Sequence, residues 1–442
     1  MGHAHSSTES TPEAKRLGRR LLLTVVLPFA LVTLWALWAL RVTDTPDTDI
    51  VQENALVTEE DLHDALVIGT ALEPCMINAD PEFLCHQISV RLLEGPDEGQ
   101  KASLEILPAE NAPSISKGDE IVLLDTVATG YGEQYTYWDH VRRPPLIWLS
   151  ALFVITVLIF GRWKGAGALI GFAITILVIT QFLVPAILGG ADPLQASLTA
   201  AAAMLLTTLY LTHGLHLQTT VALIGTMIAL AITAILAKVF VETATITGLA
   251  TNEGIFVQIG TRSIDLQGII LGGVIIGSLG VLDDVTVTQA STVQALHRTD
   301  PRLSFAQLYQ RSIRVGRDHI ASTVNTLILA YAGASLPLFL LFELSGSSFR
   351  TIVNGETVAL EIIRSFTGSI GLIAAVPITT AIAAAATTAT RKKAQTDHDA
   401  EQVIAWPEES SPPRLRDTQE IPLIHPNTLT KSTITQFPEK RR

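Results

Sequence analysis

The chain has 442 residues, of which 48% are apolar and only 16% are charged, and its formal net charge is −12. Soluble domains carry about 25% charged residues, and here the apolar residues gather in long uninterrupted blocks. These properties exclude an ordinary soluble domain and predict a protein that crosses a membrane several times.

Blocks of about 20 apolar residues are typical of membrane-spanning helices. Eight such blocks occur in chain order, at residues 21–40, 146–160, 166–188, 194–212, 219–239, 268–288, 320–342 and 363–387. The second block is short and must extend into Pro144–Pro145 or into residues 161–163. The sequence therefore predicts a mainly α-helical integral membrane protein with eight transmembrane helices. An uncleaved anchor helix occupies residues 21–40, and a seven-helix membrane domain occupies residues 144–390.

Clusters of Lys and Arg predict the orientation, because basic residues near the ends of spans stay on the cytoplasmic side. If residues 1–20 form a cytoplasmic tail, every cluster falls on that side, and eight crossings return the C-terminus there too. Only Arg142 and Arg143 oppose this orientation. The clusters lie at Lys15–Arg20, Arg162–Lys164, Arg298–Arg317 and Arg391–Lys393.

Residues 41–143 are expected to form one extracytoplasmic β-rich domain. Between residues 42 and 140 there are 21 Asp and Glu but only 3 Lys and Arg. Three segments have the alternating or β-branched pattern of strands and are separated by turn-rich sequence, at Ile88–Leu93, Lys101–Leu107 and Glu120–Val127. A small β-barrel or sandwich fits this pattern. Its acidity suits attraction of cations or basic partners, and it equally suits an exposed domain that must stay soluble.

The chain contains two cysteines, Cys75 and Cys85, and both lie in this outer domain. In an oxidising compartment they could form a disulfide, and the alternative is two free thiols. No metal is assigned, since no HExxH motif is present, and no cofactor is expected, since no Rossmann or phosphate-loop glycine motif is present. Nothing indicates nucleic-acid binding. Residues 391–442 carry many prolines among polar residues, so they are predicted to be a disordered cytoplasmic tail.

The sixth apolar block is rich in glycine. Four-residue spacings between glycines allow helix backbones to approach closely in lipid. We therefore predict a helix-packing role for Gly268, Gly272, Gly273, Gly277 and Gly280. This packing role would hold whatever the function of the protein.

Two adjacent aspartates, Asp283 and Asp284, end this block. A charged side chain within a span costs at least about 2.5–3.5 kcal/mol, so such residues usually have a function. The seventh block opens with its own polar residues, and because the two spans are antiparallel, both polar stripes fall in the cytoplasmic half of the membrane. The predicted proton or cation site comprises Asp283, Asp284, Thr288, Asp318, His319, Ser322, Asn325 and Thr326. In the alternative interpretation these residues have only a structural role. The aspartates then lie at a hydrated helix end, and the Asn325 side chain donates hydrogen bonds to backbone carbonyls.

Two local features flank this pair of spans. Pro301–Val315 is predicted to be a short surface helix with Ser304 as its N-cap. Glu361 and Arg364, three residues apart at the outer end of the eighth block, are expected to pair with each other.

Long motifs in the membrane domain resemble the YibE/F family of bacterial membrane proteins. They are Gly190–Leu194, His213–Gly214, Ala222–Gly225, Gly280–Val285, Ser291, Gly316–Pro337, Gly368–Gly371 and Pro377–Thr380. The resemblance covers roughly residues 141–390 and extends only loosely to the outer domain. It implies a bacterial plasma membrane but no particular activity.

The sequence favours a transporter-like protein of unknown substrate, coupled to protons or small cations through Asp283 and Asp284. This arrangement is similar to that of proton-driven exporters and the SecD/SecF components, by analogy only. In those proteins too, a glycine-rich span that ends in Asp is followed by a span that begins with polar residues. One alternative is a non-transporting assembly or partner-binding protein. A second is an intramembrane enzyme that uses Asp283 or Asp284 with Asp318 or His319, but the sequence contains no known signature of one.

Overall fold

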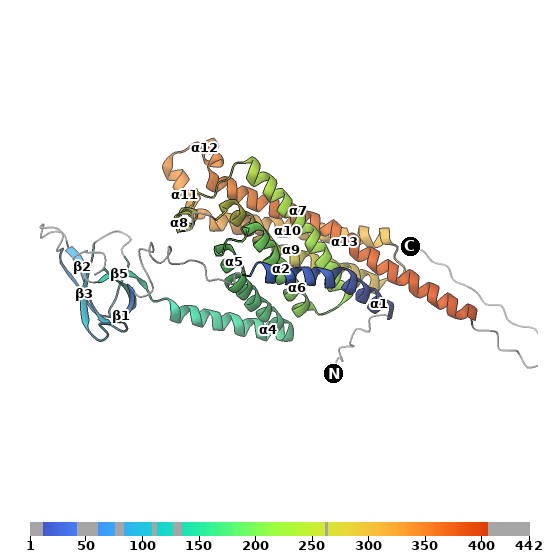
Figure 1. Ribbon diagram of the computed structural model, residues 1–442, viewed down its shortest axis with the longest axis horizontal. Coiled ribbons are helices and arrows are strands. Elements are labelled where there is room, and N and C mark those ends of the chain that lie inside the picture. The colour runs from blue at the N-terminus through green and yellow to red at the C-terminus, as the bar shows by residue number, and fades with distance from the viewer. Residues whose placement is uncertain are drawn as a thin grey trace, which may run out of the picture. The chain divides into compact units, whose positions relative to one another are not determined.

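Figure 1 shows the computed structural model, which describes residues 12–41, 61–75, 84–107, 113–126, 135–260 and 264–404. The described chain contains a small antiparallel sheet in its N-terminal region and is otherwise mainly helical. Among these residues, six helices are long and apolar enough to cross a membrane, or seven if one bent pair is counted as a span. The helical membrane class is therefore confirmed, at a lower span count than the sequence predicts.

The first span is longer than its apolar block. It consists of α1 (Pro12–Leu21), a π-helical turn (Leu22–Val26) and α2 (Leu27–Ala39), and the part that qualifies as a span is Arg16–Ala39. The expected N-terminal tail is thus already helical from Pro12 onward, and its first 11 residues lie outside the described part of the chain.

The predicted second and third spans form one helical element with a break. α4 (Arg143–Val178) continues through a π-helical turn (Ile179–Leu183) into α5 (Val184–Leu188). Arg162 has φ 51° and ψ −133°, which is not helical. The chain turns back here, as Figure 1 shows, and a Cβ on Gly165 would lie 3.2 Å from the carbonyl carbon of Val157. Residues 143–161 and 163–188 each have the length to cross a core of about 30 Å. An eighth span depends on this break and stays a prediction.

The sheet has five antiparallel strands in the order β3-β2-β1-β4-β5. Three match the predicted segments, namely β2 (Leu84–Leu92), β3 (Lys101–Ile106) and β4 (Glu120–Asp125), whereas β1 (Leu62–Pro74) and β5 (Tyr135–His140) were not predicted. Alternate residues fill one core, among them Val67, Val90 and Leu123. The edge strands β3 and β5 also contact each other, so the sheet curls toward a partly closed barrel.

The bundle core is built mainly from small and aliphatic side chains of four helices, and Val26, Leu183 and Ala186 add to it. The four helices are α6 (Pro193–His213), α7 (Leu217–Thr243), α9 (Leu266–Thr299) and α13 (Glu356–Ile404). Their contacts are close because small residues face one another, as where Ala200, Ala229 and Ala375 are all fully buried. The shorter helices α8 (Asn252–Gly260), α11 (Leu336–Ser345) and α12 (Phe349–Asn354) lie between the long ones in the chain.

The segment Pro301–Val315 is helical from Phe305 onward, but it is not the separate short helix that the sequence predicts. α10 runs unbroken from Phe305 to Ala334, because no proline separates the connector from the seventh apolar block and the single Gly316 does not end the helix. Its N-cap is Ser304, as predicted, and it forms a capping box with Gln307. A bend of 58° separates α10 from α11, and together they make the seventh candidate span.

The C-terminal helix also runs beyond its apolar block. α13 extends to Ile404, so the first part of the segment predicted to be a disordered tail is helical, and residues 405–442 lie outside the described part of the chain. Near the start of α13, Arg364 pairs with Glu361 at 3.1 Å, as expected from their spacing.

Candidate functional site

Asp283 lies midway along α9 and is half-buried. Leu282 and Val285 on either side of it belong to the buried core of the bundle. The Oδ1 atom of Asp283 is shielded from solvent and has no hydrogen-bond partner among the described residues. Asp284, the next residue, is exposed. The two aspartates are therefore not equivalent, because only Asp283 presents an enclosed carboxylate oxygen.

The polar side chains that follow Asp283 on the buried face of α9 are paired. Thr286 Oγ1 hydrogen-bonds Thr226 Oγ1 of α7 at 2.6 Å. Gln289 Nε2 donates to the Ser312 carbonyl of α10 at 3.1 Å and to Thr380 Oγ1 of α13 at 2.7 Å. These links between helices were not predicted from the sequence. The available signal was Gln289, a long amide side chain among the shorter hydroxyl residues Thr286, Thr288 and Ser291.

Two contacts fix the register between α9 and α10. Gln289 meets Ser312 near one end, and a Cβ on Gly277 would lie 3.5 Å from the hydroxyl of Tyr331 near the other. The helices are therefore antiparallel, and Ser322 lies at about the depth of Asp283. This depth agrees with the premise of the predicted site.

α10 is rotated about its own axis so that apolar side chains, and not the predicted site residues, face the core of the bundle. A site shared with α9 would require the opposite. Ile313, Ile320 and Val324 pack against the core of the bundle. The predicted site residues on this helix are exposed, and they are Asp318, His319, Ser322, Asn325 and Thr326. Thr326 Oγ1 donates to the Ser322 carbonyl of its own helix. Thr288 on α9 is also exposed. The structure thus brings the two polar sets to one depth without a hydrogen bond or ion pair between them.

The glycines of α9 serve two different surfaces. Gly268 and Gly272 face α6, where an added Cβ would lie 3.2 Å from Pro193 Cβ and 2.9 Å from Ser197 Cβ respectively. Gly273, Gly277 and Gly280 are exposed. A close approach also occurs at Gly316 of α10, where a Cβ would lie 2.5 Å from Val376 Cγ1 of α13 and 2.9 Å from Gln289 Oε1.

A cavity of about 890 Å³ opens where α6 ends and α7 begins. On α9 its wall includes Val287, Ala290 and Gln294, which follow Asp283 at helical positions i+4, i+7 and i+11. Those spacings place the three residues on the same face of the helix as Asp283. The cavity therefore starts one helical turn from the enclosed carboxylate.

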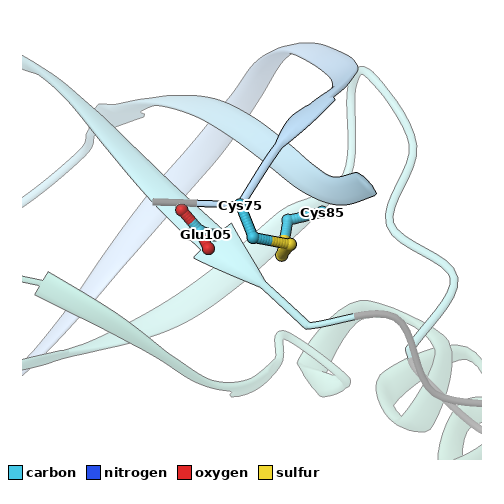
Figure 2. Close-up of side chains that lie close together, drawn as sticks. All are labelled: Cys75, Cys85 and Glu105. Carbon is cyan, nitrogen blue, oxygen red and sulfur yellow. A yellow bond between two sulfur atoms is a disulfide. The ribbon is translucent and has the colours of Figure 1, made fainter. Parts of the chain in front are cut away.

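The five-stranded sheet contains a group of side chains with the composition of a metal site. Glu105 offers a carboxylate oxygen within 4.8 Å of the sulfur atoms of Cys75 and Cys85. Figure 2 shows that the two sulfur atoms are bonded to each other. The Cα atoms of the two cysteines are 5.0 Å apart. Metal binding by cysteine requires thiolates, so the disulfide leaves Glu105 as the only ligand of the three.

Long apolar helices around a packed core, with a carboxylate at mid-helix, define a polytopic α-helical membrane protein. Residues 149–389 match the family described as YibE/F-like protein, which covers more than half of the chain, so the chain belongs to this family. No curated protein matches the chain. No solved structure matches it either.

Proposed function

We propose that the protein is an ion-coupled transporter of the bacterial plasma membrane, with Asp283 as the residue that binds and releases the coupling ion. One observation carries the proposal, namely the enclosed Oδ1 of Asp283 without a protein partner. An unpaired carboxylate oxygen in an apolar helix is costly, and such residues are typical of proton and ion pathways. The exposed Asp284 and Thr288 flank this position.

The cavity supplies the route by which the ion reaches Asp283. It begins at Val287, one turn away, and its lining contains Lys and Arg but no carboxylate. A lining of this charge repels a hydrated metal cation, whereas a proton can be relayed by water and by histidines such as His213. We therefore favour a proton over a metal ion. The positive-inside rule assigns this end of the bundle, and both termini, to the cytoplasm.

Complementation of a deletion strain tests the proposal. Growth is compared across pH and added metals in strains that carry the wild type, Asp283→Asn or the control Asp265→Asn, at equal protein levels. Asp265 is an exposed carboxylate at the start of the same helix. The expected result is a pH-dependent phenotype that the wild type and the control rescue and that Asp283→Asn does not. Full rescue by Asp283→Asn would make Asp283 structural and remove the main support for transport.

A second candidate function, a partner-binding or assembly protein, is favoured by the exposed polar stripe of α10. Polar side chains facing lipid are costly, and another protein chain would cover Asp318, Ser322 and Asn325. Site-specific crosslinking from Ser322→Cys tests this alternative. A specific crosslinked protein that Ser322→Cys captures and Leu329→Cys does not would support it, since Leu329 is an exposed apolar residue of the same helix.

A further inference from the structure

The cavity has a strongly basic rim contributed by several helices. Its charged or ionisable lining residues are Arg19 of α1, Lys164 of α4, His213 of α6, His216 of the following turn, and His297 and Arg298 of α9. No Asp or Glu lines it. These six side chains come from distant parts of the chain, so they gather at this place only through the fold.

The fixed charges of the rim are not neutralised within the described part of the chain. Arg19, Lys164 and Arg298 form no ion pair with any residue that the structure describes. Asp284 lies outside the lining, but its carboxylate and the Lys164 ammonium are both near enough to His213 for their charges to act there. Positive charge therefore exceeds negative charge around the cavity.

Neutral hydrogen-bonding groups line the deeper wall. Gln218 of α7 hydrogen-bonds Ser291 of α9 across the cavity wall. Thr219 and Thr220 of α7, both buried, line it as well. Converging cations with nearby hydroxyl and amide groups are the surroundings that phosphate oxygens prefer in proteins.

We infer that this cavity binds an oxyanion of the phosphate class at its basic rim. The ligand is either a phospholipid headgroup or a phosphate compound free in solution. Basic pockets between transmembrane helices on the cytoplasmic side bind anionic headgroups, and a cavity of about 890 Å³ also has the volume of a small-molecule site. The inference stands apart from proton coupling at Asp283, because it requires only the rim charges.

The test measures the thermal unfolding midpoint of the purified full-length protein. One arm adds inorganic pyrophosphate in detergent, with sodium chloride at equal ionic strength as the reference. The other arm compares nanodiscs of phosphatidylglycerol with nanodiscs of phosphatidylcholine. Both arms are repeated with the double variant Lys164→Gln/Arg298→Gln and with a matched control, Arg311→Gln/Arg314→Gln. The control removes two exposed cations of α10 that do not line the cavity.

The rim variant should bind the stabilising probe at least about tenfold more weakly than the wild type, because it lacks two of the charged donors that a phosphate oxygen would accept from. The control variant should behave like the wild type. Arg298→Lys retains the charge and should retain stabilisation, which separates lost binding from misfolding. Stabilisation by pyrophosphate identifies a free ligand, and stabilisation by phosphatidylglycerol alone identifies a headgroup. Stabilisation by neither probe, or equal stabilisation of the wild type and the rim variant, would overturn the inference.

Discussion

Helices α9 and α10 both carry many polar residues within apolar sequence, but the structure uses them differently. On α9, Thr286 and Gln289 are buried and bond to neighbouring helices. On α10, the hydroxyl groups of Thr323 and Thr326 donate hydrogen bonds to backbone carbonyls of the same helix. Polar residues within a span can therefore either link helices or bond only within their own helix. Burial together with a partner on another helix distinguishes the first case from the second. Asp283 of α9 differs from Thr286 and Gln289, because its enclosed Oδ1 has no hydrogen-bond partner among the residues that the structure describes.

The largest effect on stability is expected at Gln289. Replacing Gln289 by Leu removes two interhelical hydrogen bonds and leaves the Ser312 carbonyl and the Thr380 hydroxyl without this donor. We expect a loss of about 2 kcal/mol in the free energy of unfolding, measured in mixed micelles. Gln310→Leu makes the same change at an exposed position of α10 and should have little effect. Equal losses in the two variants would break the distinction between the helices.

A smaller effect is expected for the hydroxyl that bridges α7 and α9. Thr286→Val removes the bond to Thr226 and keeps the shape of the side chain. Single interhelical hydrogen bonds in membrane proteins contribute about 0.6 kcal/mol, and we expect a loss of that size in the same unfolding experiment. Thr323→Val on α10 loses only a bond to its own helix. A larger loss of stability for Thr323→Val than for Thr286→Val would contradict the assignment of interhelical bonds to α9 and intrahelical bonds to α10.

The smallest effect is expected at Asp139, an exposed carboxylate that has the donors that Asp283 lacks. Arg142 and the His140 backbone N–H bond to it and lower its pKa below the usual value of 3.8. A lowered pKa means that its stabilising contribution is present above pH 3.8 and is lost as the pH falls through the folded pKa. Arg142→Gln should therefore raise the Asp139 pKa in an NMR titration and lower the unfolding midpoint at neutral pH only slightly, because the pair is exposed. An unchanged Asp139 pKa would refute the pairing.

Much of the fold could be predicted because it follows from local pattern. Apolar blocks located the long helices, and alternation located three of the five strands. β5 (Tyr135–His140) was missed because Asp139 and His140 interrupt its apolar alternation, and β1 (Leu62–Pro74) was missed because Gly69 and its adjoining small residues obscure the strand pattern. The unbroken α10 was missed because a basic connector resembles a surface helix whether or not it continues into a span.

The candidate site could be predicted only in part. Asp283 was found because a carboxylate after a long apolar run is conspicuous in a sequence. The surroundings of Asp283 could not be predicted, because they depend on how α10 is rotated about its axis. That rotation is determined by tertiary packing, such as the contact of Gly316 with Gln289. The basic cavity joins Arg19, Lys164 and Arg298 from three separate helices. No local pattern connects residues so far apart in the chain.

If Asp283 exchanges protons through the cavity, its carboxyl group must change protonation with pH. Infrared difference spectroscopy detects such a change. Spectra of the purified protein in lipid are recorded as the pH is changed, for the wild type, Asp283→Asn and Asp265→Asn. The account predicts a carboxyl band that changes with pH in the wild type and in Asp265→Asn and that is absent from Asp283→Asn. Identical pH-induced spectra for the wild type and Asp283→Asn would contradict it.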